Sequence, residues 1–185
     1  MLKLNLESLA NREAWAEKGI KLPEYDIDNM RDNTKANPVW LHFGAGNIFR
    51  GFIAVLQQRL LNEGLAESGI IAADTFDYDM IDKIYKPYDN LVLNVGLKAD
   101  GNTNLEVVAS LAEAVKGDFT EAAQRQRLME IIAAPSLQMV SFTITEKGYA
   151  LRDMDGNLLN LVKQDIEAGP NLPKHAMSVV TALLW

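Results

Sequence analysis

The chain has 185 residues, of which 48% are hydrophobic, which is enough for one well-packed domain. It contains no cysteine, which excludes disulfides and cysteine-bound metals, predicts no metal site and is compatible with a cytoplasmic enzyme. The net charge of −7 with scattered Lys and Arg argues against a nucleic-acid partner. Neither a membrane-spanning apolar run nor a secretory signal is present, so we expect no membrane partner.

Residues 1–36 are expected to form an arm ahead of the main domain. A short helix is predicted between Leu9 and Lys18. The following stretch, LPEYDIDNMRDNTKANP at 22–38, is polar, contains two prolines and has no clear period. It predicts an irregular segment that leads into the domain.

The domain is expected to begin with a strand, a glycine loop and a helix. Val39–Phe43 is a short apolar strand, and the loop Gly44–Asn47 follows it. Apolar residues then recur at helical spacing up to about residue 62, before Gly64, a typical helix end. These residues are Phe49, Phe52, Ile53, Leu56 and Leu60.

The middle of the chain predicts three more strands. Ile70–Ala73 is short and apolar, and a polar stretch with at most one helical turn follows it. Leu91–Leu97 and Leu105–Leu111 are strand-like and flank Asp100-Gly101, a strong hairpin signal. This hairpin is an insertion relative to a minimal βαβαβ unit.

The last third returns to alternating helix and strand. Asp118 and Glu121 form a capping-box pattern ahead of a helix that ends near Ala133. Met139–Thr145 alternates apolar and polar residues as a strand does, and residues 176–185 begin an apolar helix. Strands alternating with helices predict an α/β fold with a doubly wound, mostly parallel sheet, an N-terminal arm and an inserted β-hairpin.

The apolar helix at the end of the chain has no polar or glycine ending. We therefore expect Trp185 to lie inside a longer protein, the alternative being a C-terminal helix that docks on the domain.

The segment WLHFGAGNIFRGF nearly matches the Rossmann dinucleotide fingerprint, G-x-G-x-x-G between a strand and a helix. Gly44 and Gly46 match the glycines for the tight turn and the pyrophosphate, whereas Phe49 replaces the one that packs helix on strand. Arg50 is unfavourable in a first helical turn unless it faces a phosphate or carboxylate. We expect cofactor contacts along the loop, from Gly44, Ala45, Gly46, Asn47, Ile48, Phe49 and Arg50.

Polar residues at the ends of two strands extend the expected site. Asp74 ends the second strand, where the fingerprint has an acidic residue that binds the ribose 2′-OH and favours NAD over NADP. Thr145 and Glu146 follow a later strand, and ligands of open α/β sheets lie beyond such strand ends. We expect Thr145 to contact the cofactor. The alternatives are that Asp74 caps a turn and that Thr145-Glu146 is an ordinary turn, and His42 is expected to be a hydrogen-bonded structural residue.

Three motifs, HFGAGNIFRGF, LPEYD and SFTITEKGY, together resemble the polyol-specific long-chain dehydrogenase family. That family includes mannitol 2-dehydrogenase, fructuronate reductase and tagaturonate reductase, and the resemblance covers residues 22–185. It implies an NAD-binding Rossmann domain at 37–175, with 176–185 as the start of a helix leading to a C-terminal catalytic domain. Members of this family commonly carry an aromatic residue near the position of Phe49.

The catalytic motif of this family is absent from the chain. The motif is a Lys, an Asn five residues later and a His three residues after that. His175 would require Lys at position 167, which is Glu167, and His42 would require it at position 34, which is Thr34. The resemblance therefore implies a cofactor domain without its catalytic lysine.

The resemblance also implies a reaction. NAD-dependent hydride transfer would interconvert a sugar alcohol or aldonate and its keto sugar, either mannonate and fructuronate or mannitol and fructose. The partners would be this polyol or aldonate and the protein's own C-terminal domain, and Glu146 is a candidate proton relay. Two alternatives stay open: a nucleotide-binding regulatory or interaction module without catalysis, and an α/β domain without a cofactor.

Overall fold

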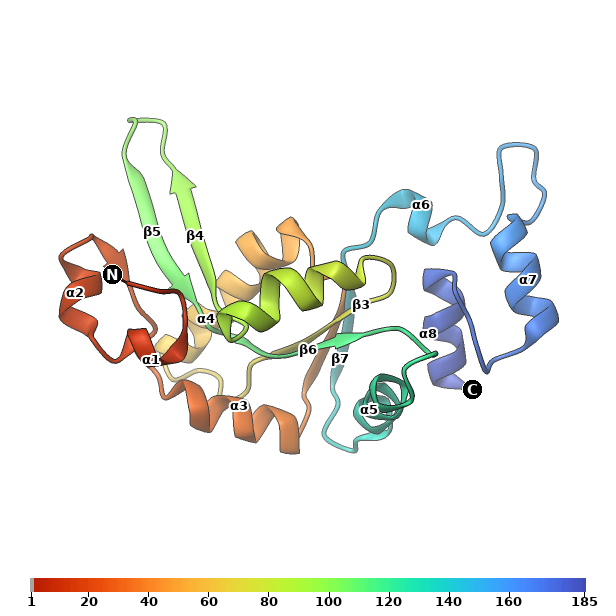
Figure 1. Cartoon of the computed structure of the whole chain (residues 1–185), viewed down its shortest axis with the longest axis horizontal. Helices are drawn as coiled ribbons and strands as arrows, with labels where there is room; N and C mark the ends of the chain where they lie inside the picture. Colours follow the sequence, from red (N-terminus) through yellow and green to blue (C-terminus); the bar gives the residue numbers. More distant parts are fainter. Residues whose placement is uncertain (1) are drawn as a thin grey trace.

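The computed structural model describes residues 2–185, which form an α/β body around a central parallel sheet (Figure 1). The sheet has four strands in the order β6, β3, β2, β7. Their bounds are Leu111–Lys116, Ile70–Asp74, Trp40–Phe43 and Met139–Phe142. This order matches the first four strands of a Rossmann sheet, so the predicted doubly wound fold is confirmed.

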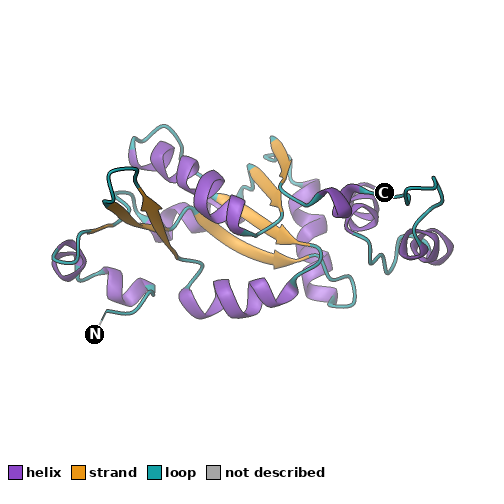
Figure 2. Cartoon of the chain, turned by 90° about the horizontal axis from the view of Figure 1, so that it is seen from above, coloured by secondary structure: helices purple, strands orange, loops and turns teal. Residues whose placement is uncertain are grey.

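Helices cover both faces of this sheet (Figure 2). One face packs against η1 (Phe49–Ile53), α4 (Ala54–Asn62) and η2 (Met80–Tyr85). The other packs against α5 (Ala122–Ala133) and α8 (Ala176–Leu184). The hydrophobic core therefore has two layers, as doubly wound folds require. None of the helices within residues 2–185 has the length and apolar character needed to span a bilayer.

The inserted hairpin is confirmed, and it projects from the body beside the N-terminal arm (Figure 1). It consists of β4 (Val92–Leu97) and β5 (Thr103–Val108), and β1 (Ile20–Lys21) of the arm pairs with β5. The predicted strand Leu105–Leu111 was wrong as a single element. It combined the end of β5 with the start of β6, which belong to different sheets.

The prediction of an irregular segment in the arm was also wrong, because residues 27–36 form a helix, α3 (Ile27–Ala36). Asp26 caps it by accepting a hydrogen bond from the Asn29 amide at 3.0 Å. The buried Thr34 hydroxyl accepts from the Gly69 amide at 2.7 Å, which ties the helix to the main domain. The helix has few apolar residues, so the sequence shows no helical period of hydrophobic residues there. Two shorter helices precede it, α1 (Leu6–Leu9) and α2 (Arg12–Ala16), in place of one predicted helix.

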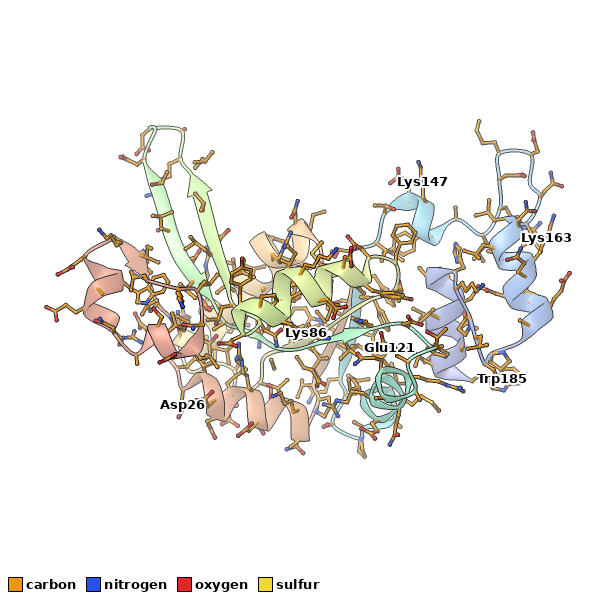
Figure 3. The ribbon with its side chains drawn as sticks, viewed as in Figure 1. Asp26, Lys86, Glu121, Lys147, Lys163 and Trp185 are labelled. Atoms are coloured by element: carbon orange, nitrogen blue, oxygen red, sulfur yellow. The ribbon has the colours of Figure 1, made fainter. Side chains whose placement is uncertain are left out.

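The predicted capping box was wrong. The Asp118 carboxylate binds the amide and hydroxyl of Thr120 in a turn, and α5 begins only at Ala122. Three further elements were not predicted: η3 (Lys86–Tyr88), α6 (Glu146–Tyr149) and α7 (Asn160–Ala168). The apolar C-terminal helix is confirmed as α8, after which Trp185 ends the chain (Figure 3).

A chain of hydrogen bonds joins β2 to β7 on the face that η1 covers. The Trp40 indole N–H donates to Ser141 Oγ at 2.6 Å, and Ser141 Oγ lies 2.7 Å from His42 Nδ1. His42 Nε2 lies 2.8 Å from Thr143 Oγ1, and the Thr143 hydroxyl donates to the Gly44 carbonyl at 3.1 Å. The prediction that His42 is a structural residue is therefore confirmed.

One arrangement of protons satisfies every member of this chain. Because Thr143 gives its hydroxyl proton to Gly44, it accepts a hydrogen bond from His42 Nε2–H. His42 Nδ1 is then the acceptor for the Ser141 hydroxyl. The ring is neutral, and burial lowers the pKa of His42 to about 4.

We expect His42 to make the fold less stable in mild acid. Its pKa is about 4 when folded and about 6.5 when unfolded, so the unfolded chain binds more protons between these values. Stability is therefore complete above about pH 6.5 and falls towards pH 4, by about 3 kcal/mol at most. Urea unfolding from pH 8 to pH 4 measures this loss. The variant His42→Gln should show a shallower fall, and an equal fall in both proteins would contradict the assignment.

Candidate functional site

A cavity of about 430 Å³ opens at the carboxyl ends of β3, β2 and β7. The connections after β2 and β7 diverge here to opposite faces of the sheet, and ligands bind at this switch point in doubly wound folds. The cavity brings together four residues predicted from the sequence: Gly44, Gly46, Asp74 and Thr145. These four predicted residues therefore lie together at one place in the fold.

The two glycines of the loop serve different purposes. Gly44 has φ of +107°, and an added Cβ would lie 2.7 Å from the Thr143 carbonyl oxygen, so the fold itself requires glycine there. An added Cβ at Gly46 would meet nothing within 4 Å, and its φ lies outside the left-handed region. Neither conformation nor packing within the chain requires Gly46 to be glycine. The open space beside it suits the close approach of a ligand.

The helix after the loop begins with free backbone amides directly after Gly46. Its first backbone hydrogen bond runs from the Arg50 amide to the Gly46 carbonyl at 3.1 Å. The amides of Asn47, Ile48 and Phe49 come before this bond, so they have no carbonyl partner in the helix. Such a helix start binds anions through its N–H groups and its dipole.

Ala45 is held by the protein on both sides of its backbone. Its amide donates to Asp74 Oδ2 at 3.2 Å, and its carbonyl accepts from the Tyr85 hydroxyl at 2.6 Å. Burial raises the pKa of Tyr85, so this hydroxyl keeps its proton and remains a donor. Ala45 thus fixes the position of the loop, and its own backbone groups are already bound.

Phe49, at the position of the missing third glycine, is accommodated by the helix and by a histidine. The side chain is buried and stacks on His42 with ring centroids 4.9 Å apart. The residues Phe49–Ile53 form a π-helical turn, which is wider than an α-helical one. The wider turn leaves room for the ring between helix and strand.

Asp74 organises the loops around the cavity with three backbone hydrogen bonds. Besides the Ala45 amide, it accepts from the amides of Phe76 and Asp77 at 2.9 and 2.8 Å. The alternative reading, a turn cap, is thus part of its role. A carboxylate offers about four lone-pair sites, so about one remains for a ligand hydroxyl. The predicted ribose contact is compatible with this geometry and stays a prediction.

Asn47 and Arg50 face a different hollow from the one described above. It has a volume of about 370 Å³, and Tyr88 and Asn94 also line it. The Arg50 guanidinium donates to the Asn47 side chain. The geometry therefore separates the Arg50 side chain from Gly44 and Gly46, which line the cavity at the strand ends.

The segment after β7 supplies Thr145 and Lys147 to the cavity wall, and Figure 3 shows Lys147 on α6. Glu146 begins α6, is exposed and does not line the cavity. Its role as a proton relay stays a prediction.

Several cavity residues were not predicted from the sequence: Phe76, Asp77, Met80, Lys174 and His175. Phe76 is 90% exposed, an unusual state for an aromatic side chain. Its position directly after Asp74 was the available signal. Lys174 and His175 lie far along the chain, and only the fold brings them to the cavity.

Comparison with known proteins supports the same reading of the chain. Residues 38–184 match the family model described as the mannitol dehydrogenase Rossmann domain. A D-mannonate oxidoreductase of Thermotoga maritima is 47% identical over 184 residues, covering 100% of this chain and 34% of the relative. A D-mannonate oxidoreductase of Escherichia coli is 28% identical over 159 residues, covering 83% of this chain and 32% of the relative.

A solved structure shares the fold. It is the Pseudomonas fluorescens mannitol 2-dehydrogenase in a ternary complex with NAD and D-mannitol, with a TM-score of 0.73 and 24% identity. The match covers 94% of this chain and 35% of that one. The chain thus spans about a third of the length of the curated relatives and of the solved structure.

Proposed function

The chain belongs to the mannitol dehydrogenase family as its Rossmann domain, and we propose that it binds NAD for an oxidoreductase acting on a sugar alcohol or aldonate. The observation that carries the proposal is the open space beside Gly46, where a Cβ would meet nothing. This space adjoins a helix start with free amides. The solved structure with this fold is a complex with NAD and D-mannitol, which supports the same cofactor here.

The proposed cofactor contacts follow the order of the strand ends. Asp74, after β3, would accept a hydrogen bond from the adenosine ribose, and the amides after Gly46 would bind the pyrophosphate. Thr145, after β7, would contact the nicotinamide half. When bound, NAD supplies the hydride acceptor, and the residues of this chain hold and orient it.

The charge on the β3 side of the cavity favours NAD over NADP. Asp74 and Asp77 both line the cavity there. A 2′-phosphate on the ribose would lie close to these carboxylates, and like charges repel at short range. No lysine or arginine of residues 2–185 lines this side of the cavity to offset them.

The substrate is proposed for the whole protein and not for this chain alone. The relative with 47% identity is a D-mannonate oxidoreductase, which favours mannonate and fructuronate over mannitol and fructose. The catalytic Lys, Asn and His implied by the family resemblance would come from the protein's own C-terminal domain. This enzyme reading is preferred over a regulatory module without catalysis, because the relatives are oxidoreductases.

The first prediction from this proposal tests NAD binding at the glycine loop. Gly46→Val should weaken NADH binding at least about tenfold, because the side chain fills the space proposed for the pyrophosphate and removes contacts worth at least about 1.4 kcal/mol. The melting temperature should change little, since this Cβ meets nothing in the chain. Isothermal calorimetry and thermal unfolding measure the two effects.

The neighbouring glycine is the matched control. Gly44→Ala should lower the melting temperature clearly, because its φ is positive and its Cβ would collide with Thr143. The proposal of NAD binding fails if the folded wild-type chain shows no heat at millimolar NADH. It also fails if Gly46→Val binds NADH as well as the wild type does.

A second prediction concerns the exposed ring of Phe76. It stands beside Asp74 at the cavity edge, its own amide bound to the Asp74 carboxylate, and it is placed to stack on adenine. Stacking of a base on an aromatic side chain is worth about 1–3 kcal/mol. Phe76→Ala should therefore weaken AMP binding about fivefold or more, as measured by calorimetry. Phe52→Ala, which removes an exposed ring outside this cavity, should leave AMP affinity unchanged.

A third prediction concerns the full-length protein. We expect it to oxidise D-mannonate with NAD at a kcat/KM at least about tenfold above that for D-mannitol. D-Mannitol lacks the carboxylate of D-mannonate, and a lost hydrogen bond to a charged group costs about 1.5–3 kcal/mol. The present chain alone should turn over neither compound. Initial rates of NADH formation measure both. A preference for D-mannitol, or activity of this chain alone, would contradict the assignment.

A further inference from the structure

We infer that His175, at the start of α8, binds an acceptor oxygen on the nicotinamide half of the dinucleotide. The inference rests on the proposed NAD binding and adds a residue to it. His175 borders the cavity at the ends of β3, β2 and β7, and the residue is only 6% exposed. No glycine-loop or strand-end pattern points to this residue.

The protonation of the ring follows from its contact with α8. His175 Nδ1 accepts a hydrogen bond from the Met177 amide at 3.3 Å and thereby caps the nine-residue helix. A nitrogen that accepts carries no proton, so the proton of the neutral ring lies on Nε2. Nε2–H is therefore a donor.

This donor has no partner within the chain. Nε2 is buried and makes no hydrogen bond to any of residues 2–185. Buried donors are almost always paired, so an unpaired one points to a partner from outside the chain. The empty space that the ring borders is the cavity proposed for the cofactor. Nε2 is covered in this structure, so the contact requires a small rotation of the ring that keeps Nδ1 within reach of the Met177 amide.

The backbone around His175 is held in place. The buried Asp165 carboxylate accepts from the Lys174 amide at 3.1 Å and from the His175 amide at 2.8 Å. Lys174 also borders the cavity, and the helix start adds the positive end of a dipole. A donor, a cation and a helix start together favour a ligand oxygen.

The position of α8 selects the nicotinamide half. α8 packs against α6, the helix that follows β7, and the two lie side by side in Figure 1. His175 is therefore on the β7 side of the glycine loop, opposite Asp74 on the β3 side. With the adenosine on Asp74 and the pyrophosphate at Gly46, the nicotinamide half extends towards His175. Beyond the pyrophosphate, which is assigned to the glycine loop, the carbonyl oxygen of the carboxamide is the strongest acceptor on that half.

The experiment compares NADH with ADP-ribose, which lacks the nicotinamide. His175→Asn removes the Nε2 donor but keeps a side chain that caps helices well. Its affinity for NADH should fall about five- to tenfold, as expected for a lost hydrogen bond, and its affinity for ADP-ribose should stay within about twofold. Calorimetry at pH 8 measures both ligands. Thermal unfolding of the variant checks that α8 stays capped.

Each result has a defined meaning. An equal loss for both ligands, or no loss for NADH, would overturn the role of His175. Gly46→Val is the control, because it should weaken both ligands equally through the shared pyrophosphate. If the wild-type chain binds neither ligand, NAD binding itself fails, and the inference fails with it.

Discussion

The hydrogen-bond chain from Trp40 through Ser141, His42 and Thr143 to the Gly44 carbonyl fixes the geometry on which the site depends. It joins the neighbouring strands β2 and β7 at the point where their connections diverge. Thr143 lies so close to Gly44 that a Cβ there would collide with it. The same close contact between β7 and the end of β2 therefore makes Gly44 obligatory.

The same network explains how the loop tolerates Phe49. A glycine at this position normally lets helix and strand pack closely. Here the neutral ring of His42 offers a flat surface, and the Phe49 ring stacks on it. A charged imidazole would be costly in this buried place, and the low pKa of His42 keeps it neutral. The stacked rings of His42 and Phe49 thus take the place of the third glycine in the fingerprint, and the π-helical turn provides the space for the Phe49 ring.

Local sequence signals predicted the sheet strands, the glycine loop and the hairpin. Short apolar runs indicate buried strands, and Asp100-Gly101 suits a tight hairpin turn, without any need for distant contacts. These local signals failed where tertiary contacts determine the secondary structure. The helix α3 is mostly polar and depends on Thr34 and Asp26, and β5 and β6 look continuous although they belong to different sheets. Gly46 and Asp74 were visible in the sequence. His175 was not, because only the packing of α8 brings it to the cavity.

The two sides of the cavity differ in charge and in hydrogen-bonding groups, and under the proposed function this difference would orient a bound dinucleotide. Asp74 and Asp77 form the β3 side, whereas Lys147, Lys174 and the start of α8 form the β7 side. Ribose hydroxyls donate to carboxylates, and amide oxygens accept from N–H groups. A dinucleotide turned end for end would place its carboxamide oxygen near two carboxylates and leave the buried donor of His175 unpaired. The hydrogen-bond donors and acceptors that line the cavity would therefore favour the proposed orientation, with the adenosine on the β3 side.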